Sequence, residues 1–159
     1  MSKSLLIVGA GPAVEGNRRL PRGYDSLWTF LSAYRKHSDL KKANVVWDCH
    51  DLDECEGDPL YLYDIRNANI SHPMIAKYGP RFSSQIAWMI AKAIEAGFTH
   101  IGLYRLMNHL SEEYFSQVPD IMYFIGWGRS KGVTFSFDPT SVLCVPQLYG
   151  LEEVTDDRT

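Results

Sequence analysis

Ser4–Val8, with the sequence SLLIV, runs directly into the loop Gly9-Ala10-Gly11-Pro12. An uninterrupted run of this kind, with four large apolar residues, is typical of a strand buried on both faces of a parallel sheet. Glycines after such a strand let backbone N–H groups approach a phosphate or ribose closely. The stretch therefore predicts a buried central strand followed by a ligand-binding loop, with Gly9, Ala10, Gly11 and Pro12 as candidate contacts.

The loop departs from the dinucleotide-binding fingerprint GxGxxG. Val14 occupies the position of the third glycine, and Pro12 removes one backbone donor. A tight turn without a ligand is therefore the alternative interpretation of this loop.

Strands and helices alternate along the rest of the chain. We expect strands near 44–47, 60–65, 100–104 and 133–137, and helices over 26–34, 83–96, 111–117 and 119–130. Helix 83–96 has the clearest signals, because Ser83 or Ser84 can cap its start and Gly97 can end it. The alternation predicts an α/β, Rossmann-like three-layer fold with a mostly parallel central sheet. We expect one domain over residues 4–150 and a polar tail over 151–159.

Charge and cysteine content narrow the class of protein. The 159 residues carry a net charge of -3, whereas a general electrostatic nucleic-acid binder is usually basic. The cysteines, Cys49, Cys55 and Cys144, lack metal-ligand spacing and indicate free thiols in a reducing compartment. The first apolar run is too short for a signal peptide or a membrane span, so we expect a cytoplasmic protein without membrane contact.

Basic residues gather in the first third of the chain, at Arg18, Arg19, Arg22, Arg35, Lys36, Lys41 and Lys42. We expect them to form a solvated surface. The alternative is that the first three arginines steer an anionic ligand toward the nearby loop.

Two further sets of polar residues are candidates for a site. Asp48 and His50 follow a predicted strand, and ligands of open α/β sheets bind outside the strand ends. His50 is a candidate general base oriented by Asp48, with a surface histidine as the alternative. Ser83 and Ser84 begin the clearest helix, where a capping role and an anion contact can coexist. The sequence contains no GxSxG, HExxH, CxxC or Walker A motif, and we expect no cofactor and no metal.

Large aromatic residues suggest an interface. Trp88 shares a helical stripe with Gln85, Lys92 and Glu95, on the polar side of helix 83–96. Such a position indicates a partner surface or a pocket wall, with burial under a loop as the alternative. Phe124 and Trp127 share a face of the later helix. These residues predict a homo-oligomer, most simply a dimer, with Trp88 or Trp127 at its interface.

Longer segments resemble a family of small bacteriophage proteins of unassigned function. The segments are LLIVGAGPA at 5–13, FSSQIAWMIAKAIEAGFTHIGLY at 82–104, EEYFSQVPDIMYFIGWGRSKGVTF at 112–135 and PTSVLCVPQLYG at 139–150. The resemblance covers most of residues 4–150 and implies an accessory protein in the cytoplasm of the host cell.

The chain is more distantly similar to the bacterial single-domain sialyltransferases, in which a GNGPS loop and a TSG…GxD block contact the CMP part of the donor. Gly9, Gly11 and Pro12 match the loop, while Ala10 and Ala13 replace its Asn and Ser. Ser83 and Ser84 fall near the TSG segment. Arg105 and Met107 occupy the GxD end. The similarity implies nucleotide contacts at the loop, Ser83, Ser84 and Arg105, whereas the departures argue against glycosyl transfer.

Three functions are therefore consistent with the sequence. The first is an accessory protein that binds a nucleotide or nucleotide-derived ligand at the carboxyl-terminal edge of the sheet. The second is a transferase or hydrolase acting on a nucleotide or nucleotide sugar, with His50 as base. The third is a non-enzymatic, oligomeric interaction protein.

Overall fold

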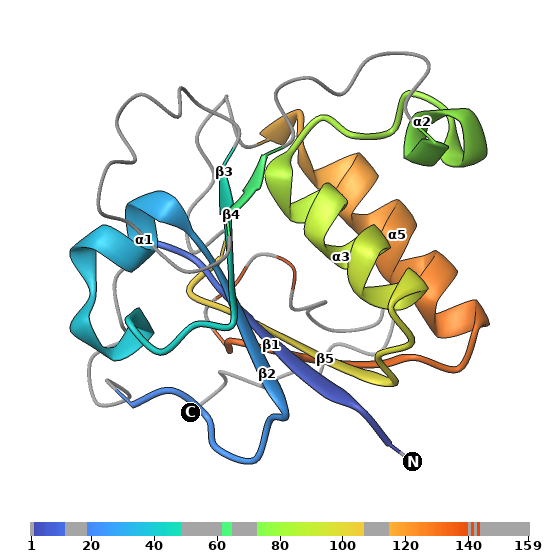
Figure 1. The fold of residues 1–159 in the computed structure, drawn as a ribbon. Coiled ribbons are helices and arrows are strands. Elements are labelled where there is room, and N and C mark those ends of the chain that lie inside the picture. The colour runs from blue at the N-terminus through green and yellow to red at the C-terminus, as the bar shows by residue number, and fades with distance from the viewer. Residues whose placement is uncertain are drawn as a thin grey trace, which may run out of the picture.

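The computed structural model describes residues 2–11, 19–48, 62–64, 73–106 and 115–139, together with Ser141 and Leu143. These residues form one parallel sheet with helices on both faces (Figure 1). The strands are β1 (Ser4–Val8), β2 (Ser26–Phe30), β3 (Val45–Asp48), β4 (Leu62–Asp64), β5 (His100–Tyr104) and β6 (Thr134–Phe137). The helices are α1 (Leu31–Lys36), the short 3-10 helix η1 (Ser38–Leu40), α2 (Pro73–Tyr78), α3 (Gln85–Glu95) and α5 (Val118–Ser130).

The strand order places β1 in the interior of the sheet. The order is β4-β3-β2-β1-β5-β6, and every neighbouring pair is parallel. The chain first builds outward from β1 to β4 and then returns to place β5 on the other side of β1. The predicted α/β fold and the central position of the first strand are confirmed. The reversal between β1 and β5 is a topological switch point, where ligands of doubly wound sheets bind.

Both faces of β1 are buried, as its continuous apolar run predicts. Leu5 and Ile7 belong to the core shared with α3 and α5, whereas Leu6 and Val8 pack with residues of α1 and η1 such as Leu40. In Figure 1, α3 and α5 lie together on one side of the sheet and α1 lies on the other. The chain therefore has the predicted three layers. None of the helices within the described ranges is both long and apolar enough to cross a membrane.

The predicted helix over 26–34 is wrong in its first half. Ser26–Phe30 is strand β2, and the helix begins only at Leu31. Pairing with β1 and β3 outweighs the helical spacing of the apolar residues. The buried Thr29 hydroxyl also donates a hydrogen bond to the carbonyl oxygen of Val8, at 2.8 Å. Helix α2, which the sequence pattern did not indicate, precedes α3.

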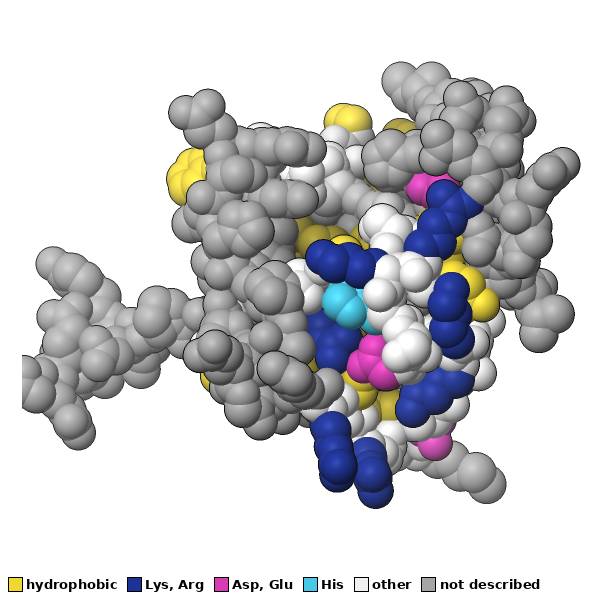
Figure 2. All heavy atoms as spheres, turned by 90° about the vertical axis from the view of Figure 1, so that its left-hand side faces the viewer, with side chains coloured by type: hydrophobic (Ala, Val, Ile, Leu, Met, Phe, Trp, Pro, Cys, Tyr) yellow, Lys and Arg dark blue, Asp and Glu magenta, His cyan; other side chains and the backbone are white. Residues whose placement is uncertain are grey.

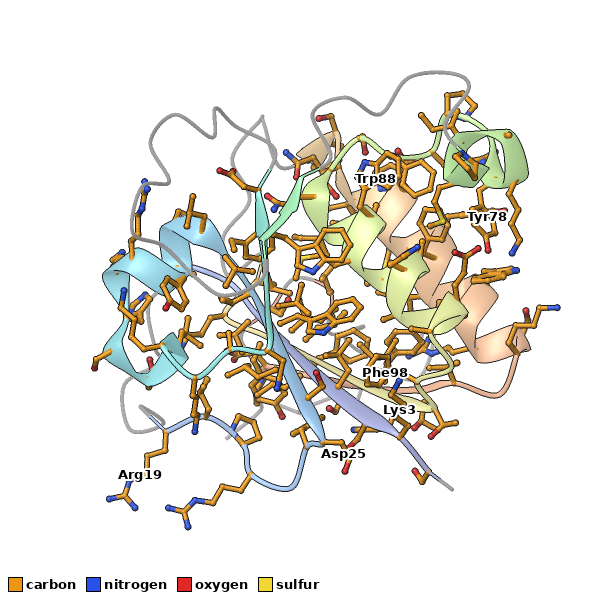
Figure 3. All side chains as sticks on the ribbon, in the orientation of Figure 1. Lys3, Arg19, Asp25, Tyr78, Trp88 and Phe98 are labelled. Atoms are coloured by element: carbon orange, nitrogen blue, oxygen red, sulfur yellow. The ribbon has the colours of Figure 1, made fainter. Side chains whose placement is uncertain are left out.

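The partner surface predicted at Trp88 is also wrong. Trp88 is only 6% exposed, and its ring stacks on Phe82 with centroids 4.0 Å apart. Phe82 in turn stacks on Phe124, which is fully buried, and Tyr78 of α2 packs edge-on against Trp127 at 5.0 Å. This aromatic cluster lies among α2, α3 and α5 (Figure 3). Burial within the chain, the alternative interpretation, therefore holds for Trp88, and the homo-oligomer stays a prediction without this support.

Several predictions fall outside the described residues. They concern the three cysteines, the acidic loop over 51–58, most of the helix over 111–117, and the tail over 151–159.

Candidate functional site

Gly9 follows β1 at its carboxyl end, beside the last residue of β5. Its N–H donates to the carbonyl oxygen of Tyr104 at 3.0 Å, and the N–H of Gly11 donates to that of Arg105 at 3.2 Å. A Cβ atom on Gly9 would meet the Arg105 carbonyl oxygen and would lie 2.6 Å from Cδ2 of Leu106. The glycine is therefore required by packing against β5. Because these two N–H groups donate to Tyr104 and Arg105, any anion contact at this edge would require other donors.

Arg105 supplies such a group at the end of β5. Its side chain is only 7% exposed, and its backbone has a φ of 52°, in the left-handed region. Nη2 donates to Oδ2 of Asp39 in η1 at 3.1 Å, so the guanidinium reaches toward the elements that cover β1 and β2. A non-glycine residue in this conformation costs on the order of 1–3 kcal/mol, and such strain is concentrated at functional sites.

Residues from the end of β6 hold the Arg105 backbone in place. The buried carboxylate of Asp138 accepts the Arg105 N–H at 3.3 Å, and the Asp138 N–H donates to the Leu103 carbonyl oxygen at 3.0 Å. The Ser141 hydroxyl donates to the carbonyl oxygen of Leu106 at 2.7 Å. These bonds fix the turn that follows β5 and preorganise its side chains.

Tyr104, the last residue of β5, carries a partly buried phenol. Burial is the largest effect that raises the pKa of its phenol, and the nearby Tyr24 and Asp138 act in the same direction. A hydrogen bond with Ser136 of β6 acts in the opposite direction and holds the phenol against the sheet.

Ser84 caps α3 as predicted. Its hydroxyl oxygen accepts the Ala87 N–H at 3.2 Å, and Gly97 follows the helix with a φ of 79°. The Ser83 N–H, however, donates to the Asp120 carboxylate at 3.1 Å. A carboxylate already at this helix start disfavours a second anion there. The capping role is confirmed, and the anion contact stays a prediction.

Replacing Ser84 with alanine is expected to lower the free energy of unfolding by about 1 kcal/mol, because the Ala87 N–H loses its acceptor in a buried position. Lys92→Ala on the same helix is the control, because it removes no cap and should lower the free energy of unfolding less. Urea unfolding of the two variants measures the difference. Equal losses would contradict a specific capping role.

The proposed catalytic pair is separated from this turn. Asp48 ends β3 and is 5% exposed, and in the sheet it pairs in register with Asp64 at the end of β4. β2 lies between β3 and β1, so Asp48 is about 10 Å from Gly9 by strand spacing. His50 and Pro12 lie outside the described residues. In the described part of the chain, no three His, Cys, Asp or Glu residues are grouped to hold a metal ion.

The structure thus brings together Gly9, Ala10, Gly11 and Arg105 at the switch point and places Asp48 two strands away. It adds two residues that the sequence did not single out as site residues, Asp39 and Asp138. The position of Asp138 directly after the last predicted strand could have indicated it. Nothing local distinguishes Asp39, because its partner is 66 positions away.

The geometry defines an α/β protein of the doubly wound class with a candidate ligand site at its switch point. Comparisons of the chain with family models, with curated proteins and with solved structures gave no match. Function is therefore argued from the site itself.

Proposed function

We propose that the protein binds a nucleotide, or a nucleotide-derived ligand carrying phosphate, at the carboxyl edge between β1 and β5. The observation that carries the proposal is Arg105, a buried arginine held in a strained conformation at the switch point. Guanidinium groups match the geometry of phosphate oxygens, and burial strengthens their interaction with an anion.

The surroundings of Arg105 support the same class of ligand. Asp39 holds one guanidinium nitrogen, which orients the group before a ligand arrives. Gly9 and Gly11 bring the loop directly against this turn, so a ligand bound there contacts both segments.

Thermal unfolding with a panel of nucleotides and nucleotide sugars tests the proposal. A ligand at 100 times its dissociation constant should add about 2.7 kcal/mol to stability. Each kcal/mol raises Tm by about 2–4 °C for a chain of this size. Arg105→Lys keeps the charge but loses the bidentate fork, so it should bind the best ligand at least about tenfold more weakly.

Arg129→Lys is the matched control, because Arg129 is exposed in the last turn of α5. It should leave the affinity unchanged. A panel with no stabilising ligand, or equal affinities for Arg105→Lys and wild type, would overturn the proposal.

One observation favours a transferase or hydrolase as a second candidate: the buried carboxylate of Asp48 lies at the same edge of the sheet. In this alternative His50 takes a proton from the attacking group, and Asp48 orients the imidazole. Product analysis with the best ligand separates the two candidates. Turnover that disappears in Asp48→Asn and His50→Gln supports the enzyme, whereas intact ligand after prolonged incubation supports binding alone.

A further inference from the structure

A cationic face covers α1, η1 and the segment before β2. Figure 2 shows lysine and arginine side chains gathered on this side of the molecule. The face consists of six exposed residues: Arg19, Arg22, Arg35, Lys36, Lys41 and Lys42. The fold thus concentrates positive charge on one side of a chain whose net charge is -3.

Among the described residues, Asp25 and Asp39 are carboxylates on this side, and the six exposed cations outnumber them. Asp39 is paired with Arg105, a seventh cation that lies beneath the surface. Asp25 accepts hydrogen bonds from the Ser4 N–H at 2.7 Å and the Ser4 hydroxyl at 2.8 Å, and these bonds lower its pKa. Figure 3 shows Asp25 at the start of β2, whereas Arg19 extends outward from the molecule.

A groove of about 820 Å³ runs through part of the cationic face. Arg19, Arg22 and Lys42 line it together with the carboxylates of Asp25 and Asp39, and the partly exposed Leu20 contributes an apolar wall. Asn44 lies in the same wall. Its Oδ1 accepts the Leu27 N–H at 2.7 Å and the Ser26 hydroxyl at 3.3 Å, so its amide hydrogens can be donated to a ligand.

We propose that the cationic face binds single-stranded nucleic acid through its sugar–phosphate backbone. The cations come from three separate segments, which suits successive phosphates along a strand better than a single phosphate. The groove combines cations with the partly exposed side chains of Leu20 and Tyr24, against which an unstacked base of a single strand can lie. Arginine makes up half of the face and favours phosphate over other anions.

An anionic membrane surface fits this face less well. Interfacial binding uses large apolar side chains beside the cations. The exposed large apolar side chains of the described residues are Phe115 and Tyr123, which precede α5 and lie in α5, away from α1 and η1. The proposal goes beyond nucleotide binding at the carboxyl edge and does not depend on it.

Fluorescence anisotropy with labelled 20-nucleotide oligo(dT) and oligo(U) tests the proposal at several salt concentrations. If four phosphates are contacted, the logarithm of the binding constant should fall with the logarithm of the salt concentration, with a slope of about -3.

The double variant Lys41→Glu/Lys42→Glu should bind at least about tenfold more weakly. Its slope should be shallower by about 1.4 if both lysines contact phosphates. The matched control Arg129→Glu/Lys131→Glu makes the same change of charge at exposed positions at the end of α5 and should change affinity less than about twofold.

Unfolding temperatures of both double variants should lie within about 4 °C of wild type, because all four side chains are exposed and their contacts with Tyr34 and Phe137 are surface contacts. Absence of salt-dependent binding to either oligonucleotide, or equal losses in the two variants, would overturn the proposal. Binding to phosphatidylserine vesicles without binding to oligonucleotides would also overturn it. If Lys41→Glu/Lys42→Glu loses oligonucleotide binding but keeps the wild-type Tm shift with the best nucleotide, the cationic face and the carboxyl-edge site are separate.

Discussion

Replacing Trp88 with alanine is expected to lower the free energy of unfolding by about 3–5 kcal/mol, the usual cost of deleting a buried tryptophan. The indole is almost completely buried and stacks on Phe82, which also stacks on Phe124. Its removal leaves a cavity among α2, α3 and α5 and withdraws one stacking partner of Phe82. Denaturant unfolding at equilibrium measures the loss.

Phe115→Ala provides the control for Trp88→Ala. Phe115 is 68% exposed, so its removal should change stability by no more than about 0.5 kcal/mol. Sedimentation of the Trp88 variant should give the same mass as wild type, because the indole is covered within its own chain. A reduced mass together with unchanged monomer stability would restore the interpretation of Trp88 as an interface residue.

Replacing Gly9 with alanine should affect both stability and ligand binding. The new methyl group would meet the carbonyl oxygen of Arg105, which is backbone and can withdraw only if β1 and β5 separate locally. Such overpacking costs about 1–3 kcal/mol. Because the same movement displaces Arg105, we expect affinity for the best nucleotide to fall by at least about tenfold.

Gly126→Ala separates this clash from the general effect of exchanging glycine for alanine. Gly126 lies in α5, and a Cβ there would have no atom within 4 Å. The change should therefore stabilise the protein by about 0.5–1 kcal/mol. Thermal and denaturant unfolding of the two variants should give opposite signs. Two shifts of the same sign and size would contradict the requirement for glycine at position 9.

The parts of the fold that were predicted correctly depend on local signals. Ser4–Val8 has only apolar residues after its first position, and a strand of this kind needs two covered faces whatever its neighbours are. Ser84 and Gly97 are capping residues whose effect is confined to the helix ends. β2 was missed because its apolar spacing also fits a helix, and only pairing with β1 decides between the two.

The site was predictable only in part, for a related reason. The loop after β1 could be located because glycines follow a buried strand. The strain at Arg105 depends on Asp138 and Asp39, which come from distant segments. The interpretation of Trp88 assumed that α3 buries one stripe, but Phe82 also covers the stripe that carries polar residues. A helix with neighbours on two sides does not follow the simple amphipathic pattern.

The strand order also has a consequence for how the chain is made. β1 pairs with β2 early in the sequence, but its other neighbour, β5, begins only at His100. Until the ribosome has released that segment, the apolar strand SLLIV is an open sheet edge, the kind of surface on which nascent chains associate wrongly. Pairing β1 with β5 joins parts of the chain that are far apart in sequence, and such contacts slow folding. The strand order that creates the switch point therefore leaves β1 unpaired on one side until β5 has been synthesised. A chaperone that binds the nascent chain would act on that exposed edge.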